Sequence, residues 1–302
     1  MKDRLTIALP VYKRTDFVRK ALESAINQTV ECSILLIDNH SPHNEFKEII
    51  ESYRNVDIEY VKTEETVPQD ENFNNCFRFA KTPWVTVLHD DDMLHFQYVE
   101  FCRDIFNRFG EKVGGIIYKN HVGEEEWDEV DKRKKLTDDI RKLNPSYFHF
   151  HNIPFPGVLL KKDQALKIGG FNNDLHPIAD FDFWYRYSLI ENVYYVNQEM
   201  AYFRISPTQS TNRLIDSMIN NIYEYRLREI RKSKHNNLLA KLGLEYSRMN
   251  NIQYFKDTYY EVEMPKRFIN EDKMTKASRI LKNRVIRKTV EKYMNYLSFS
   301  KA

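Results

Sequence analysis

Residues 84–92 read WVTVLHDDD, an apolar run that ends in three adjacent carboxylates, and this stretch decides the fold. The apolar part predicts a buried strand from Trp84 to Leu88, and its carboxyl end is where open α/β sheets bind ligands. Three neighbouring carboxylates repel one another, so they need a divalent metal or another cationic partner. Oxygen ligands favour Mn²⁺ or Mg²⁺. The alternative is a solvated acidic turn before a helix that starts near Phe96.

On both sides of this stretch, strand-like runs alternate with helical patterns. Strands are predicted at residues 5–11, 33–37, 58–61, 116–122, 158–160 and 193–203, and helices at 15–26, 46–53, 72–80, 98–109, 164–168 and 181–190. Thr15 is the expected N-cap of the first helix. The succession predicts an α/β fold with a Rossmann-like, mostly parallel central sheet flanked by helices. The polar segment 124–142 predicts an exposed loop of the kind that forms lids.

The C-terminal third has a different pattern, because it is helical from residue 213 onward. We therefore expect a catalytic domain at residues 1–212 and a helical C-terminal extension at residues 213–302. Residues 280–297 predict an amphipathic helix whose apolar stripe comprises Ile280, Leu281, Val285, Ile286, Val290, Tyr293, Met294 and Leu297, with Lys and Arg opposite. Three uses of the stripe stay open: peripheral contact with an anionic membrane, packing on the protein itself, and a homodimer interface.

Composition restricts the class of protein. The chain has 302 residues, 42% of them hydrophobic, which is enough for a substantial core, and a formal net charge of +2. Its three scattered cysteines favour a reducing compartment over a disulfide framework. Neither a signal peptide nor a membrane-spanning apolar run is recognisable, so we expect a cytoplasmic location, including the inner face of the plasma membrane. Lys and Arg are concentrated in the C-terminal stretch 266–301, which has no recognisable nucleic-acid module, and this disfavours nucleic acid as a partner.

Five segments, in this order, resemble one enzyme family. They are ALPVYKRTDFVRKALESAINQT from residue 8, ILLIDNHS from residue 34, NFNNCFRFAKTPWVTVLHDDDML from residue 72, GGFNND from residue 169 and ADFDFWYR from residue 179. Together they are similar to the inverting family 2 glycosyltransferases with the GT-A fold, of the type found in bacterial cell-surface polysaccharide synthesis. The resemblance covers residues 5 to about 210.

The resemblance implies a nucleotide-sugar site on the first two strands. Tyr12 would stack on the nucleobase, with Pro10 shaping the rim beside it. Many relatives have two adjacent Asp after the second strand, whereas this chain has Asp38 and Asn39. The Asn amide can both donate and accept a hydrogen bond, so it can still bind the edge of a pyrimidine base. The sugar donor is therefore expected to be UDP-linked or dTDP-linked. An Asx turn is the structural alternative for this pair.

The same resemblance assigns the chemistry. Asp91, with Asp92, would hold the metal, and Asp90 would reach the ribose and the metal, while His89 stands where many relatives have an Asp. Asp180 matches the base that deprotonates the acceptor, although Ala179 replaces the Glu that usually precedes it; an N-cap is the alternative role. Arg204 would hold the diphosphate through its guanidinium.

The implied activity is metal-dependent transfer of one sugar to a saccharide or undecaprenyl-pyrophosphate-linked acceptor. Single additions are expected because the Gln-x-x-Arg-Trp element of the family's processive synthases does not occur. The competing hypothesis is a non-catalytic nucleotide-sugar-binding or scaffold protein. It draws on the departures at His89, Ala179 and Ser206, the last near a position where relatives frequently carry a metal-binding His.

Overall fold

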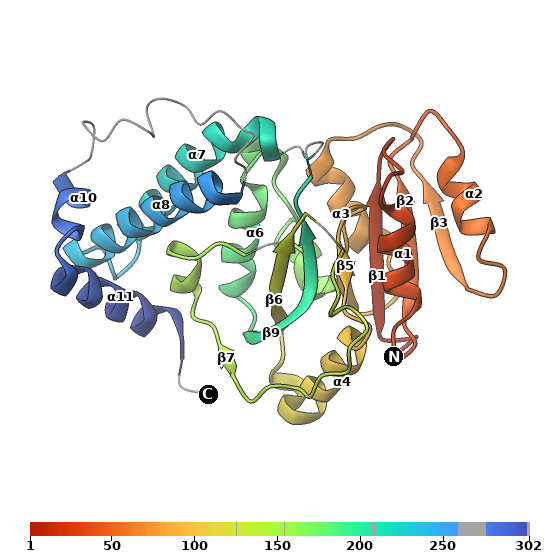
Figure 1. Ribbon diagram of the computed structural model, residues 1–302, viewed down its shortest axis with the longest axis horizontal. Coiled ribbons are helices and arrows are strands. Elements are labelled where there is room, and N and C mark those ends of the chain that lie inside the picture. The colour runs from red at the N-terminus through yellow and green to blue at the C-terminus, as the bar shows by residue number, and fades with distance from the viewer. Residues whose placement is uncertain (125, 154, 207–208, 210, 259–275, 301–302) are drawn as a thin grey trace. The chain divides into compact units, whose positions relative to one another are not determined.

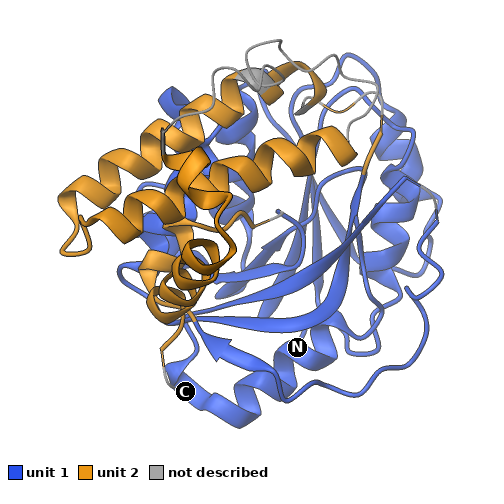
Figure 2. Ribbon diagram, turned by 60° about the vertical axis from the view of Figure 1, so that its left-hand side comes forward, with its two compact units in different colours: residues 1–142, 154–204 blue, residues 143–153, 205–302 orange. Residues whose placement is uncertain are grey.

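The apolar run before the three carboxylates forms strand β4, Trp84–Val87, inside a large sheet (Figure 1). The computed structural model describes residues 1–302 except 125, 154, 207–208, 210, 259–275 and 301–302. The chain divides into two units, coloured separately in Figure 2: residues 1–142 and 154–204 form unit 1, and residues 143–153 and 205–302 form unit 2.

Within the described residues, nine strands of unit 1 form one sheet in the order β3-β2-β1-β4-β8-β6-β9-β5, with β7 paired to β9. Strands β3, β2, β1, β4, β6 and β9 run in one direction, and β8, β5 and β7 run in the other. The predicted mostly parallel sheet is therefore confirmed. The remaining bounds are β1 Leu5–Val11, β2 Ser33–Asp38, β3 Ile58–Lys62, β5 Met93–Leu94, β6 Gly115–Gly123, β7 Ile140–Lys142, β8 Val158–Lys161 and β9 Val193–Arg204.

Helices cover both faces of this sheet. Helices α1 (Val18–Ile26), α2 (Glu45–Glu51) and α4 (Tyr98–Phe109) share one hydrophobic cluster with alternate residues of β1, namely Leu5, Ile7, Leu9 and Val11. Helices α3 (Gln69–Phe79), α5 (Lys162–Lys167) and α6 (Ala179–Ser188) lie on the other face. Because both faces are covered, all seven residues of β1 are buried, as is typical of parallel sheets.

One local prediction in unit 1 is wrong and another is incomplete. Thr15 is not the N-cap of the first helix, because α1 begins at Val18 and the Thr15 hydroxyl donates to Glu45 instead. Segment 124–142 is more than an exposed loop, since it contains β7 and the buried Trp127, whose ring stacks on Tyr202. The sequence analysis missed both features, because a three-residue strand and a single aromatic residue give no periodic pattern of apolar residues.

Unit 2 is helical in its described residues. It contains α7 (Thr211–Lys232), α8 (Leu238–Thr258), α10 (Lys276–Leu281) and α11 (Arg284–Ser298), together with the 3₁₀ helix η2 (Pro145–His149). Asn283 caps α11, because its side-chain oxygen accepts hydrogen bonds from the backbone N–H groups of Val285 and Ile286. The helical extension expected beyond residue 213 is confirmed.

The apolar stripe of α11 packs inside unit 2. Val290, Met294 and Leu297 join a buried cluster with α7, α8 and Phe150 of the segment 143–153. Val285, in contrast, is 74% exposed, and the exposed Ile280 lies on the separate helix α10, so the prediction of one helix with a single apolar stripe over residues 280–297 is wrong at these two positions. Helix α11 turns Val285 and Tyr296 to solvent instead, beside its basic residues.

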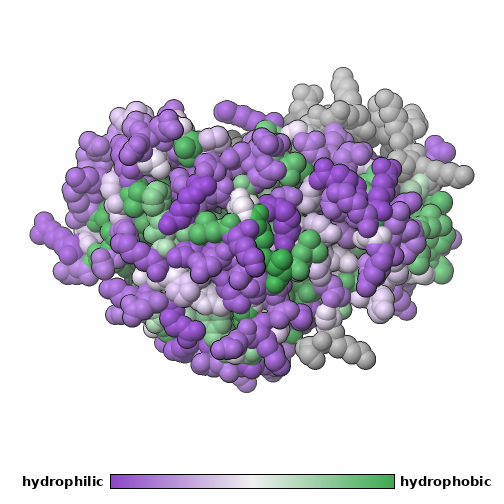
Figure 3. Space-filling model, turned by 180° about the vertical axis from the view of Figure 1, so that it is seen from behind, coloured by the Kyte–Doolittle hydropathy of each residue, from purple (hydrophilic) through white to green (hydrophobic). Residues whose placement is uncertain are grey.

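One face of the protein is mostly hydrophilic (Figure 3), and the cysteines form no disulfide among the described residues. Hydrophilic residues cover most of the face seen in Figure 3, where hydrophobic residues form small separate groups. All three cysteines are free, and Cys76 and Cys102 are buried. Over the described residues, no helix combines the length and the apolar character that crossing a membrane demands.

Arg226 of α7 holds the segment 143–153 against the helices of unit 2. It is 1% exposed, and its guanidinium donates to the Phe148 carbonyl at 2.9 Å, to Asn152 Oδ1 at 2.9 Å and to Ser247 Oγ at 3.2 Å. Arg226→Met should lower the free energy of unfolding by about 3 kcal/mol, because several buried acceptors lose a charged donor. Urea denaturation measures this change. The control Arg231→Met, at an exposed site of the same helix, should stay within about 0.5 kcal/mol; equal losses for the two variants would contradict the assigned role.

Candidate metal and nucleotide-sugar site

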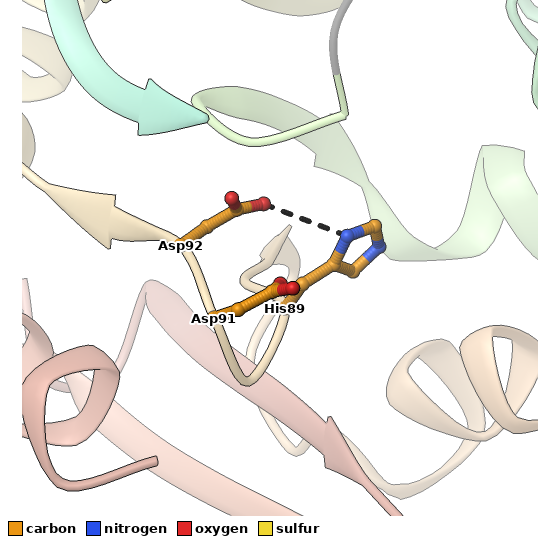
Figure 4. A group of neighbouring side chains, drawn as sticks. All are labelled: His89, Asp91 and Asp92. Carbon is orange, nitrogen blue, oxygen red and sulfur yellow. Dashed lines mark ion pairs between the residues drawn. The ribbon is translucent and has the colours of Figure 1, made fainter. Parts of the chain in front are cut away.

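The three carboxylates form a tight turn between β4 and β5. Asp92 is fully buried, and its Oδ2 lies 3.5 Å from His89 Nδ1, so that the two groups point toward one another (Figure 4). One ligand atom each of His89, Asp91 and Asp92 lies within 4.8 Å of the other two. The short strand β5 pairs with β9 and thereby fixes the end of the turn.

Two arginines from distant parts of the sequence meet this turn. Arg14, in the loop after β1, places Nη2 2.5 Å from Asp90 Oδ1 and 2.7 Å from Asp91 Oδ2. Arg204, at the end of β9, donates its backbone N–H to Asp92 Oδ1 at 3.0 Å and its Nε–H to the Asp91 carbonyl at 2.9 Å. Arg204 is 2% exposed, so in this structure it braces the turn, and its contact with a diphosphate stays a prediction.

Burial sets the proton affinities of the turn. It raises the pKa of the Asp90 carboxyl to about 6, although the hydrogen bond from Arg14 acts in the opposite direction. It also raises the pKa of Asp92 well above its usual range, and the charge of Asp91 adds to this effect. Burial lowers the pKa of His89 to about 4, so the imidazole is neutral near pH 7 and carries a free lone pair for a metal.

These residues fit a divalent cation. Among the described residues, nothing donates a hydrogen bond to Asp92 Oδ2, although the atom is buried. A bound cation would satisfy this oxygen and offset the repulsion between the carboxylates. Two ligand atoms at about 2.1 Å from one ion are separated by roughly 3 to 4 Å, which brackets the 3.5 Å between His89 Nδ1 and Asp92 Oδ2. His89, Asp91 and Asp92 are therefore the candidate ligands.

The loop after β1 carries the residue predicted to stack on a nucleobase. Tyr12 is 38% exposed, and Pro10 is buried within β1 beside Ile37 of β2. Lys13 adopts a left-handed backbone with φ of 58°, which is held because its N–H donates to Ser41 Oγ and its carbonyl accepts from His43 Nε2. The loop therefore presents an accessible aromatic ring on a fixed backbone.

The pair that ends β2 is engaged inside the protein. Asp38 is fully buried and accepts hydrogen bonds from the Ser41 N–H at 2.8 Å and the Tyr60 hydroxyl at 2.9 Å. Asn39 forms two 2.9 Å hydrogen bonds with the backbone of Val67, one as donor and one as acceptor. An Asp at this position would lack the donor for the Val67 carbonyl. The amide thus anchors the segment before α3, and recognition of a base by this pair stays a prediction.

Asp180 lies in the first turn of α6, where Ile178 is the N-cap residue, so Asp180 is not the cap. Its Oδ1 accepts from the backbone N–H of Phe181 at 2.9 Å, and the side chain is partly exposed. Asp182 has a different role, because it pairs with Arg186, which in turn donates to the carbonyls of Ile168 and Gly170.

The glycine turn before α6 is locked to α3 by one amide. Asn74 accepts from the Phe171 N–H at 2.7 Å and donates to the Phe171 carbonyl at 3.0 Å. Gly170 has a φ of 67°, and a Cβ there would lie 2.2 Å from Asn74 Oδ1. Only glycine satisfies both the backbone conformation and this close approach.

Aromatic packing connects the acidic turn to α6. The Phe155 ring lies 4.4 Å from the His89 ring, 5.4 Å from Phe171 and 5.5 Å from Trp184, centroid to centroid. Phe171 stacks on Phe183 at 4.2 Å. The rings of Phe155, Phe171, Phe183 and Trp184 are all buried, so Phe155 and Trp184 belong to the core. Together the four rings hold His89 and the start of α6 in one rigid framework.

The structure adds two residues that the sequence did not assign. His89 joins the metal-binding group as a candidate ligand, and its position directly before the carboxylates was a usable signal. Arg14 contacts two of the three carboxylates across 76 residues of sequence. No local pattern reveals such a contact, because it depends on β1 and β4 being neighbours in the sheet.

Comparison with known proteins gives one family. The sequence model of Glycosyl transferase family 2 matches residues 6–163. An uncharacterized glycosyltransferase of Rickettsia typhi is 24% identical over 223 residues, which is 71% of this chain and 68% of the relative. An uncharacterized glycosyltransferase of Haemophilus influenzae is 22% identical over 290 residues, covering 88% of this chain and 93% of the relative.

Solved structures agree in fold. TarS residues 1–349 of S. aureus match with a TM-score of 0.59 at 11% identity, covering 87% of this chain and 75% of that one. A mannosyltransferase from Pyrobaculum calidifontis, solved in complex with GDP-Man and Mn²⁺, matches with a TM-score of 0.58 at 11% identity, covering 97% of this chain and 85% of that one. These likenesses support the GT-A architecture predicted for the sheet and its helices.

Metal binding can be tested through stability. Mn²⁺ should raise the melting temperature of the parent, because a ligand that binds only the folded state stabilises it. Asp92→Asn keeps the oxygen that accepts from Arg204 and removes the buried charge. The variant should gain about 1 kcal/mol of unfolding free energy without metal and lose the response to Mn²⁺. Thermal unfolding with and without Mn²⁺ measures both effects.

The matched control is Asp163→Asn, at a carboxylate whose side chain is 83% exposed. Its melting temperature should respond to Mn²⁺ as the parent's does. An Asp92→Asn variant that Mn²⁺ stabilises as much as the parent would argue against this site.

Proposed function

Because the chain belongs to glycosyl transferase family 2, we propose that it transfers a single sugar from a nucleotide-sugar donor to an acceptor hydroxyl, with inversion at the anomeric carbon and with a divalent metal. The acidic cluster of His89, Asp91 and Asp92 at the carboxyl end of β4 is the observation that carries the proposal. Its buried, unsatisfied oxygen is consistent with a cation that completes the site in the working enzyme.

The donor is proposed to be UDP-linked or dTDP-linked. The partly exposed Tyr12 supports stacking on the base, and the fixed backbone after β1 limits the entropy lost on binding. The rim beside the base is proposed to include Pro10, and the base itself is proposed to meet Asp38 and Asn39. Asp90 is proposed to face the ribose, and Arg204 the diphosphate. Mn²⁺ or Mg²⁺ held by the acidic cluster would neutralise charge on the departing nucleoside diphosphate.

Asp180 is proposed as the catalytic base. A carboxylate in the first turn of α6, partly exposed and fixed to the aromatic framework of His89, supports this role. As the acceptor oxygen attacks the anomeric carbon, its proton passes to the Asp180 carboxylate, and the bond to the diphosphate breaks on the opposite face of the sugar. Asp182 does not compete for the role, since its carboxylate is bound to Arg186.

The proposed acceptor is a saccharide or an undecaprenyl-pyrophosphate-linked glycan in cell-surface polysaccharide synthesis, made at the cytoplasmic face of the membrane. The solvent side of α11 supports peripheral membrane contact. Arg284, Lys288 and Lys292 form one row at four-residue spacing, beside Val285 and Tyr296, which are 74% and 77% exposed. Membrane contact would use this face, because the opposite stripe is packed within unit 2.

Asp180→Asn tests the chemistry. The variant should keep the metal-dependent binding of nucleotide and lose about a thousandfold in transfer rate, because general base catalysis contributes about 10² to 10⁴. Donor consumption with UDP-, dTDP- and GDP-sugars and a supplied acceptor measures it. Asp174→Asn, at an exposed carboxylate before the same helix, should transfer as the parent does. If the parent binds nucleotide and never consumes donor, the protein is a binding or scaffold protein instead.

Charge reversal tests the membrane face. Lys288→Glu combined with Lys292→Glu should lower binding to vesicles with anionic lipid at least about tenfold, because each basic residue near such a surface contributes about 1 kcal/mol. Vesicle flotation measures the change. The control Lys241→Glu on α8, also at an exposed position, should bind nearly as the parent does; undiminished flotation of the double variant would refute this contact.

A further inference from the structure

The guanidinium of Arg14 occupies the place of a cation in the acidic turn. It holds both oxygens of Asp90, with Nη2 2.5 Å from Oδ1 and Nε 3.3 Å from Oδ2. The same Nη2 lies 2.7 Å from Asp91 Oδ2. The side chain is 23% exposed, so water reaches it and it can change partners without leaving a buried core.

This arrangement places Arg14 in competition with a metal. Asp91 is one of the candidate metal ligands, and one of its oxygens is already paired with a guanidinium. A divalent ion that binds Asp91 there removes one favourable ion pair and brings two cations close together. Both effects weaken metal binding as long as Arg14 stays on Asp91.

Because the backbone next to Arg14 is anchored, the change that accompanies ligand binding is expected in the Arg14 side chain. Lys13 is held by Ser41 and His43, so the loop is anchored next to Arg14. Arg14 also lies two residues from Tyr12, the proposed stacking residue for the nucleobase. A nucleotide bound against Tyr12 therefore brings its diphosphate to the loop that carries Arg14, and a guanidinium pairs with phosphate oxygens as well as with carboxylates.

We propose that Arg14 is an exchangeable counter-ion that couples metal binding to nucleotide binding: it neutralises Asp91 in the free enzyme and moves from Asp91 to the donor's diphosphate when the metal binds. This inference rests on the proposed function. Arg14 is a positioning residue in this scheme, since it acts through Asp91 and the phosphates. Its five N–H donors allow it to keep Asp90 while it exchanges its second partner.

The coupling has a measurable signature. In the parent, nucleoside diphosphate should tighten Mn²⁺ binding by about tenfold, within the range usual for coupled sites, and Mn²⁺ should tighten nucleotide binding by the same factor. Without a cation at position 14, Asp91 is available to the metal in the free enzyme. Arg14→Gln should therefore bind Mn²⁺ alone about tenfold more tightly than the parent, and the further gain from nucleotide should be at least about threefold smaller than in the parent, because only the direct attraction between the metal and the diphosphate remains.

Electron paramagnetic resonance of free Mn²⁺ measures the Mn²⁺ affinity of the full chain. Titrations of the parent and of Arg14→Gln, each with and without UDP or dTDP, give the four affinities that the comparison needs. Arg19→Gln is the matched control. It removes the same charge from α1, where Arg19 contacts Ser52 and not the acidic turn, and it should bind Mn²⁺ within about twofold of the parent. Arg14→Lys keeps the charge without the fork of donors, and its coupling factor should fall at least about threefold.

Mn²⁺ affinity of Arg14→Gln that equals or falls below that of the parent, without nucleotide, would overturn the inference. If Arg14→Gln does not fold, an unchanged coupling factor in Arg14→Lys would do the same. These results leave the proposed function intact, because the parent still binds metal and nucleotide. A parent that binds no Mn²⁺ would instead refute the proposed metal dependence, and this inference with it.

Discussion

Repulsion among three adjacent carboxylates at the end of β4 is the constraint on which the rest of unit 1 depends. The turn is stabilised because two neighbouring elements contribute groups that offset this charge. The loop after β1 supplies the guanidinium of Arg14, and the end of β9 supplies a backbone N–H for Asp92 and the Nε–H of Arg204 for the carbonyl of Asp91. One buried oxygen of Asp92 accepts no hydrogen bond from the described residues, and it is the atom that the proposed cation would satisfy.

The two arginines of the turn, Arg14 and Arg204, differ in burial and therefore in the role that each can have. Arg204 is buried, lies over the rings of Phe17 and Tyr202 at 4.5 and 5.1 Å, and binds backbone groups, so its loss would disturb the turn itself. Arg14 is partly exposed and its guanidinium pairs with the carboxylates of Asp90 and Asp91, so a competing cation or anion can change these pairs. The aromatic rings between His89 and α6 add rigidity, which holds the proposed base and the proposed metal ligands in one frame.

The helical unit shows how packing changes the meaning of an amphipathic pattern. The sequence of α11 is compatible with membrane contact, self-packing or dimerisation through its apolar stripe. In the structure Val290, Met294 and Leu297 are buried against other helices of unit 2, and this packing stabilises the helix. Its opposite face keeps basic residues with the exposed Val285 and Tyr296, so any partner of α11 meets a cationic surface with two apolar side chains.

The sequence by itself determined the longer strands, the covering helices, the helical C-terminal region and the acidic turn, because these follow from local apolar runs and from the charge next to them, whereas the short strands β5 and β7 left no such signal. The tertiary structure alone decided the partners of the site: the pairing of Asn39 with Val67, the bracing role of Arg204, and the contact of Arg14 with Asp90 and Asp91. It also decided which side of α11 is exposed. The reason is physical, since hydrogen bonds and ion pairs join groups that only the order of strands and the packing of helices bring within 3 Å of one another.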